Sequence, residues 1–219
     1  MASASDDPTI TNPSLASFVP AIRALCTLLK VSHVPGAIIG GVAASLQGQA
    51  RATEDVDALL RLDERNLDNF LDMAMAQGFK PRIPDAVSFA RRSAVLLLEH
   101  EGSRVGVDLT LCRLPFDSDA IDRSRLIVMG DLQFSVVAPE DLIIMKAIAH
   151  RPQDFQDIRA VVRANPQLDV RRVRTQVQEF AKALDMPELW EDIAALFCAP
   201  RSQAKKISRR QANPPRKKK

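Results

Sequence analysis

Four residues in the first third of the chain have types and spacing that could bind a metal ion and a phosphate. On a β-strand, Asp55 and Asp57 would project from one face while Val56 points into the core. Two carboxylates held side by side repel each other unless a cation lies between them, and carboxylate oxygens suit Mg²⁺. Upstream, with thirteen residues between, Gly40-Gly41 would let backbone N–H groups approach an anion such as a triphosphate.

A third carboxylate, Asp108, lies in the alternating stretch Val105–Leu111, which predicts a strand. A neighbouring antiparallel strand would bring Asp108 opposite the Asp55 and Asp57 pair. Three such acids suit metal-assisted nucleotidyl transfer. Mg²⁺ would bind the triphosphate oxygens, and a second metal, or Asp108 as base, would activate the attacking hydroxyl. Paired aspartates alone would more often be solvated acids on an edge strand, so the combination carries the prediction.

The elements that must position these residues follow from apolar spacing and turn residues. Gly40-Gly41 is interpreted as a tight turn, Arg91-Arg92 as a turn between strands, and 112–132 as a polar connection. Helices are predicted over 15–31, 42–46, 64–77, 139–149, 153–164, 170–184 and 187–197, and strands over 37–39, 56–60, 87–89, 95–99, 105–111 and 134–137.

The predicted fold class is α/β (α+β), with a small mixed sheet, flanking helices and a C-terminal helical region. We expect a loose leader over residues 1–12, an α/β domain over 13–132, a helical region over 133–200 and a basic tail over 201–219.

The predicted tail differs sharply in charge from the rest of the chain. Residues 201–219 hold nine Lys/Arg and no Asp/Glu, whereas residues 1–200 hold 21 basic and 27 acidic residues, a net of −6. The tail has too little apolar surface to offset the entropy of ordering, so we expect it to be disordered. It would either attract RNA phosphates by counterion release or act as a solubilising end. Because it lacks aromatic residues, we expect no base stacking there.

Several classes of protein are disfavoured by the composition. The longest apolar runs fall short of the ~20 residues that a membrane span needs, and the N-terminus lacks the features of a secretory signal. Three scattered cysteines fit neither a disulfide framework nor a zinc site. We therefore expect a cytoplasmic protein without a membrane partner.

The stretch IIGGVAASLQGQARATEDVDALL resembles the signature of the DNA polymerase β-like nucleotidyltransferase superfamily. Within that superfamily, the pattern from Arg51 through Thr53 to Asp55 and Asp57, followed by VVAPEDLIIMKAIAHRPQDFQDI, is similar to AbiEii-type nucleotidyltransferases. Those proteins include the toxin halves of abortive-infection toxin–antitoxin pairs. The resemblance covers residues 38–158.

This resemblance implies a minimal nucleotidyltransferase fold over residues 13–132, Mg²⁺ as cofactor and an NTP as donor. It also implies Asp55, Asp57 and Asp108 as the metal-binding acids. Many superfamily members have Gly-Ser where this chain has Gly40-Gly41. Phosphate contact would therefore rest on the backbone N–H groups of the two glycines.

A second part of the resemblance lies in the helical region. Lys146, Arg151, Asp154 and Asp157 match the Lys…Arg-x-x-Asp-x-x-Asp pattern of those relatives. Lys146 stands among apolar residues, so one hypothesis is that it reaches a phosphate or an active-site carboxylate while Asp154 orients Lys146 or Arg151. The alternative is a structural salt bridge that joins the helical region to the sheet.

Four further residues have two interpretations each. Arg51 would contact a phosphate and Thr53 would cap or orient Asp55, or both would lie in a solvated loop. Arg91-Arg92, placed in a strand beside the cleft, would touch nucleic acid or form an exposed strand end.

The function predicted from these residues is Mg²⁺-dependent transfer of a nucleoside monophosphate from an NTP to a hydroxyl of RNA or protein. An antitoxin partner would accompany a toxin-like role. The alternatives are transfer to a small molecule such as an antibiotic, and a non-catalytic nucleotide-binding module. The predicted catalytic residues are Asp55, Asp57, Asp108 and Lys146, and the predicted nucleotide-binding residues are Gly40, Gly41, Arg51, Thr53, Arg151 and Asp154.

Overall fold

A computed structural model describes residues 13–49 and 52–197 of the chain. The predicted leader, Arg51 and the predicted basic tail lie outside these described residues. Seven strands within them form one mixed sheet in the order β3-β4-β5-β2-β1-β7-β6. The strands are β1 (Gly36–Ile38), β2 (Asp55–Leu60), β3 (Phe79–Pro81), β4 (Val95–His100), β5 (Val105–Leu111), β6 (Arg125–Met129) and β7 (Leu132–Val136).

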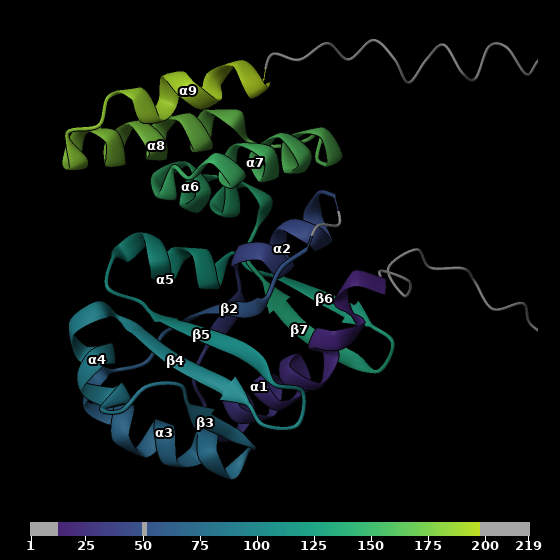
Figure 1. The fold of residues 1–219 in the computed structure, drawn as a ribbon. Helices are drawn as coiled ribbons and strands as arrows, with labels where there is room; N and C mark the ends of the chain where they lie inside the picture. Colours follow the sequence, from purple (N-terminus) through teal and green to yellow (C-terminus); the bar gives the residue numbers. More distant parts are fainter. Residues whose placement is uncertain (1–12, 50–51, 198–219) are drawn as a thin grey trace, which may run out of the picture.

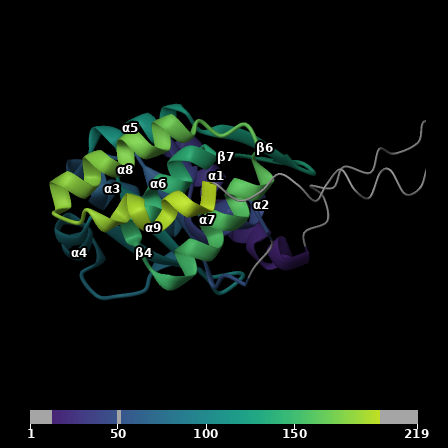
Figure 2. The same cartoon turned by 90° about the horizontal axis from the view of Figure 1, so that it is seen from above.

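Helices lie in two groups around this sheet (Figure 1). The first group flanks the strands and comprises η2 (Pro13–Phe18), α1 (Val19–Ser32), α2 (Gly40–Gln47), η3 (Glu64–Asn66), α3 (Leu67–Ala76), α4 (Ala86–Ser93) and α5 (Pro115–Asp122). The second forms a layer of its own from α6 (Pro139–Ala149), α7 (Pro152–Ala164), α8 (Val170–Leu184) and α9 (Glu188–Phe197). Figure 2 shows α7, α8 and α9 lying across the molecule over the sheet. The predicted α/β (α+β) fold class is confirmed.

The pairing of β2 with β5 determines where the acids lie. Side chains alternate along β5, so Val107 and Leu109 are buried while Asp108 is partly exposed. The two strands run parallel, with Asp57 beside Asp108 in the register. The expectation of an antiparallel neighbour is wrong for this pair, because the chain returns from β2 to β5 through α3, β3, α4 and β4.

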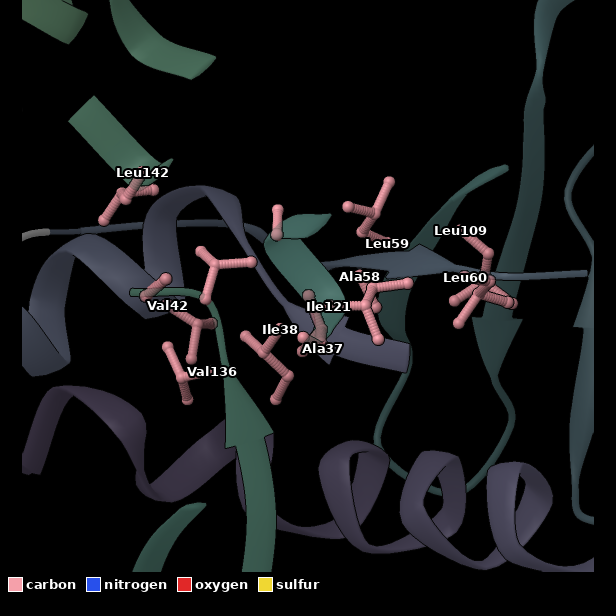
Figure 3. Close-up of a cluster of buried hydrophobic side chains, with 14 of the residues drawn as sticks. Ala37, Ile38, Val42, Ala58, Leu59, Leu60, Leu109, Ile121, Val136 and Leu142 are labelled. Atoms are coloured by element: carbon pink, nitrogen blue, oxygen red, sulfur yellow. The ribbon is translucent and has the colours of Figure 1, made fainter. Parts of the chain in front are cut away.

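Apolar side chains from both helix groups and the sheet form the core between them. Figure 3 shows Ile38 of β1, Val136 of β7 and Val42 of α2 in one cluster, with Ala58 of β2 beside it. All four side chains are at most 3% exposed. This packing places the start of α2 close to the end of β1 and the start of β2.

Helix α6 lies at the centre of the second helix group. It packs against α2, α7, α8 and α9, and its residues Ile143, Ile144 and Ala147 are at most 1% exposed. A helix that is buried on nearly all sides leaves no solvated face for a charge. Lys146, which lies on this helix and is 4% exposed, must therefore be paired inside the protein.

The predicted strand over 87–89 is wrong, because these residues belong to α4. Ala86 and Ala90 lie four residues apart and are both buried, which is the period of a helix. A three-residue apolar run was too short to separate the two possibilities. Arg91 and Arg92 therefore lie in the last turn of a helix and not in a turn between strands. Cations at a helix C-terminus interact favourably with the helix dipole.

The predicted polar connection over 112–132 also proves wrong, since it contains α5 and β6. Pro115 begins the helix, and the Asp117 carboxylate accepts the N–H groups of Arg113 and Leu114 at 2.9 Å each. Phe116 is buried beneath the polar exposed surface of the helix. Short β3 was likewise not predicted.

Two boundaries near the site differ from expectation. Gly40 and Gly41 are the first two residues of α2 and not a separate turn. β7 pairs with β1 and so belongs to the sheet. We therefore propose that any division between the α/β domain and the helical region falls between Val136 and Pro139, where the helical layer begins.

One described helical stretch, Leu15–Ser32, is long and apolar enough to cross a membrane by length and composition. Its residues Ile22, Leu25 and Leu28 are at most 1% exposed and belong to the core. That buried face is what a core helix requires.

Candidate metal and nucleotide site

Three carboxylates from two neighbouring strands meet at one point. Asp55 and Asp57 project from β2, and Asp108 projects from β5 beside Asp57. One oxygen from each carboxylate lies within 4.8 Å of the others. The spacing in the sequence predicted a shared face for Asp55 and Asp57, and the parallel register adds Asp108 to them.

The two glycines hold Asp57 in place. Gly40 has φ of +63°, and a Cβ atom there would lie 1.9 Å from Asp57 Oδ2, so no other residue type fits without displacing the carboxylate. The N–H of Gly41 donates a hydrogen bond to the same carboxylate. The backbone N–H of Ile39 donates to the Asp57 carbonyl at 2.9 Å. The glycine pair thus lets the start of α2 pack directly on β2.

Charge repulsion and burial act together on these acids. Burial, followed by the charges of Asp55 and Asp108, raises the pKa of Asp57 to about 6, although the Gly41 hydrogen bond and the charge of Lys146 act against this. Burial also raises the pKa of Asp108, and Arg82 opposes that change. An added divalent cation would relieve this repulsion, so the donor set fits Mg²⁺.

Arg82 is a site residue that the sequence reasoning missed. It follows β3, and its guanidinium forms an ion pair with the Asp108 carboxylate. Gly106 makes room for it, since a Cβ atom there would lie 3.1 Å from Arg82 Nη1. No spacing pattern links an arginine to an aspartate 26 residues later, so only the pairing of β3 with β4 and of β4 with β5 brings them together.

A second charged cluster lies between α6 and α7. Lys146 Nζ donates to Asp154 Oδ1 at 3.1 Å and lies 2.6 Å from Asp157 Oδ2. Both acids are at most 5% exposed, and they stand three residues apart on the buried side of α7. The predicted partnership of Lys146 with Asp154 is present. It joins α6 to α7 within the helical layer and not to the sheet.

Arg151 completes this cluster at its exposed edge. Its Nε donates to Asp154 Oδ2 at 2.8 Å and its Nη2 to Asp154 Oδ1 at 3.2 Å. Burial would raise the pKa of Asp154, but its hydrogen bonds with Arg151 and Lys146 leave that pKa below its usual value. Asp154 therefore orients both Lys146 and Arg151, and the 60% exposed Arg151 side chain is open to a ligand.

The three aspartates and the two cations of the second cluster, Lys146 and Arg151, line one cavity of about 630 Å³. Its walls include the three aspartates, Gly40, Gly41, Thr53, Lys146, Arg151, Gln153, Glu54 and Met145. Thr53 Oγ1 donates to the backbone carbonyl of Asp55 at 3.4 Å, so it contacts the backbone of β2. Arg91 instead pairs with Asp68 at 2.6 Å, away from this cavity. The strands β2 and β5 contribute acids to the cavity, whereas α6 and the start of α7 contribute cations. This arrangement can hold a metal ion and an anionic ligand together.

Comparisons with known proteins point to one family and one fold. A family model described as a nucleotidyltransferase of unknown function (DUF6036) matches residues 22–193. No curated protein matches the sequence. The solved antigenic nucleotidyltransferase-like protein from Paracoccidioides brasiliensis is similar, with a TM-score of 0.50 at 16% identity over 87% of this chain and 94% of that chain.

The antibiotic-resistance factor ANT(2″)-Ia is similar in two solved structures. Its solution structure has a TM-score of 0.53 at 14% identity, over 78% of this chain and 96% of that one. Its complex with adenylyl-2″-tobramycin has a TM-score of 0.52 at 15% identity, over 77% and 99%. At such identities these structures share the fold with the present chain.

Proposed function

The chain belongs to this family of nucleotidyltransferases of unknown function, and we propose that it transfers a nucleoside monophosphate from an NTP to a hydroxyl acceptor in an Mg²⁺-dependent reaction. The observation that carries the proposal is the meeting of three carboxylates within 4.8 Å in a cavity that also contains Lys146 and Arg151. AbiEii-type membership, a toxin-like role with an antitoxin and a cytoplasmic location remain parts of the proposal.

Asp55, Asp57 and Asp108 would hold the Mg²⁺. When bound, the metal supplies positive charge that stabilises the triphosphate and the leaving pyrophosphate. Asp108 would accept the proton of the attacking hydroxyl at its carboxylate, and its partner Arg82 would orient that carboxylate. The Gly40 and Gly41 backbone keeps Asp57 fixed from the other side.

The cations of the opposite wall would bind the nucleotide phosphates. Arg151 has an exposed guanidinium that is already oriented by Asp154, which lowers the entropy lost when a phosphate binds. Lys146 would add positive charge at the cavity wall, although Asp154 and Asp157 already balance much of the lysine charge. Arg51, which lies outside the described residues, and Thr53 stay proposed phosphate contacts.

Transfer of label tests this proposal directly. The purified protein is incubated with Mg²⁺ and each of four α-labelled NTPs, with RNA, protein or small-molecule acceptors. The expected result is label on an acceptor with wild type and none with Asp57→Ala. The matched control is Asp68→Ala, which removes an exposed acid outside the cavity. NTP binding without transfer to any acceptor would instead favour the non-catalytic nucleotide-binding alternative.

A small polyhydroxylated cation is the second candidate acceptor. The acidic side of the cavity favours it, since Glu54 lies there beside Asp55. ANT(2″)-Ia, which shares the fold, is known in complex with adenylyl-2″-tobramycin. Label on tobramycin but not on RNA or protein would support this candidate, and Glu54→Gln should then weaken binding of the cationic acceptor more than binding of the NTP.

A further inference from the structure

A second cavity, of about 410 Å³, lies between the end of α2 and one side of α7. Gly48 and Gln49 form one wall. The other wall is α7, through Gln156, Arg159, Ala160, Arg163 and Ala164. None of these described lining residues is acidic. The nucleotidyl-transfer reaction as proposed makes no use of this cavity.

This cavity carries two arginines and no acid among the residues that the structure describes. Arg159 and Arg163 are exposed, stand one helical turn apart and form no ion pair with any residue that the structure describes. The acids of the same helix, Asp154 and Asp157, are buried against Lys146 on its other side. The charged residues on the exposed side of α7 are therefore all basic among those described, which suits an anion and disfavours a cationic ligand.

The wall formed by the end of α2 is packed closely against α7. Gly48 packs against α7 so closely that a Cβ atom there would lie 3.0 Å from the backbone N of Val161. Asn165 Nδ2 donates to the backbone carbonyls of Gln47 at 2.7 Å and Val161 at 2.8 Å, which ties the last turn of α2 to α7. The two arginines thus extend from a helix that is hydrogen-bonded to the end of α2.

The two cavities follow one another along α7. Arg151 and Gln153, at the start of the helix, line the first cavity, and the second begins at Gln156. At ~1.5 Å per residue, about 15 Å separates the helix positions of Gln153 and Arg163. A single nucleic-acid strand with stacked bases rises ~3.4 Å per nucleotide, so roughly four nucleotides cover that length.

Building on the proposed function, we propose that the second cavity binds backbone phosphates of a single-stranded nucleic acid whose terminal hydroxyl enters the first cavity as the acceptor. The hydroxyl oxygen would form a bond to the α-phosphorus of the NTP. The bond from that phosphorus to the pyrophosphate breaks, pyrophosphate leaves, and the hydroxyl proton passes to the Asp108 carboxylate. Arg159 and Arg163 bind phosphates and determine the substrate class without contacting the reacting atoms.

Salt-dependent binding of oligonucleotides tests this site without any NTP. The full chain is titrated into a fluorescent ten-nucleotide RNA and into the DNA of the same sequence, over a range of salt concentrations. We expect Arg159→Gln/Arg163→Gln to bind roughly tenfold more weakly at ~0.1 M salt and to lower the salt slope by about 1.4, because two phosphate contacts are lost. Arg159→Lys/Arg163→Lys should retain most of that slope. The two oligonucleotides distinguish RNA from DNA as the source of the phosphates.

The matched control removes two positive charges from another exposed surface of the protein. Arg171 and Lys182 are exposed on α8, outside both cavities, so Arg171→Gln/Lys182→Gln should bind like the wild type. Equal losses in both double variants, or no loss in either, would overturn the proposal, as would a wild-type protein that binds neither oligonucleotide. Label transfer by the wild type to protein or small-molecule acceptors tests the proposed function separately, so that either proposal can fail without the other.

Discussion

The two charged clusters of the first cavity are built on opposite principles. Asp55, Asp57 and Asp108 bring three like charges within 4.8 Å, with Arg82 as a partner for Asp108. Around Lys146, by contrast, opposite charges lie in contact and are almost fully buried. The first arrangement raises the free energy of the metal-free fold, whereas the second balances its own charge. A bound cation would relieve the repulsion, so we propose that the aspartates form the chemical centre and that Lys146 mainly supports it.

The largest expected effect is the loss of activity when the repulsive cluster is broken. Asp55→Ala removes one metal ligand and should reduce label transfer by ~10³-fold or more, since a bound metal contributes several kcal/mol to the transition state. Circular dichroism should show an intact fold, because Asp55 lies at the start of β2 and is only partly buried. Transfer at the wild-type rate would remove Asp55 from the metal site.

Breaking the balanced cluster should act on stability. Lys146→Met keeps the helix but leaves Asp157 buried without its cation, so we expect the free energy of unfolding to fall by about 3 kcal/mol. Chemical denaturation measures this change. Lys146→Met/Asp157→Asn, which removes both charges, should recover part of the loss. If Lys146→Met were as stable as the wild type, the charges of this cluster would not be balanced as described.

Substitution of Gly40, the residue of α2 that lies against Asp57, should have an intermediate effect on stability and Mg²⁺ binding. Gly40→Ala places a Cβ atom against the Asp57 carboxylate and forces an L-residue to φ of +63°. We expect ~1–2 kcal/mol of lost stability from the backbone alone and weaker Mg²⁺ binding from the displaced carboxylate. Gly78→Ala is the matched control, because Gly78 has φ of +81° with open space around it. If both variants bind Mg²⁺ equally well, the close approach at Gly40 has no role in metal binding.

The smallest effect distinguishes the two clusters by pH. Because the pKa of Asp57 is raised to about 6 in the fold, its protonated form favours folding, so metal-free stability should rise as pH falls from 7 towards 4. Asp57→Asn should therefore stabilise the metal-free protein by about 1–2 kcal/mol at pH 7.5 and flatten this dependence. Thermal unfolding in chelator measures both. A variant less stable than wild type at pH 7.5 would contradict the repulsion.

Apolar spacing predicted the long elements near the site and missed the short or polar ones. Alternation along Val105–Leu111 predicted β5, in which Asp108 proves to be partly exposed. The three residues 87–89 gave too short a pattern and were assigned to a strand, while α5 was hidden by its polar exposed face. Local patterns report burial only when an element is long enough to repeat them.

Within the site, the sequence alone determined that Asp55 and Asp57 share one face and that a helix lies close behind Gly40-Gly41, although the two glycines themselves prove to be its first residues. Side-chain alternation and backbone freedom are local properties. The tertiary structure decided the rest. The parallel register put Asp108 beside Asp57, the β3 edge brought in Arg82, and the packing of α7 on α6 gave Lys146 two partners. These contacts join residues from separate elements, and their geometry depends on the packing of the whole core, which no local pattern encodes.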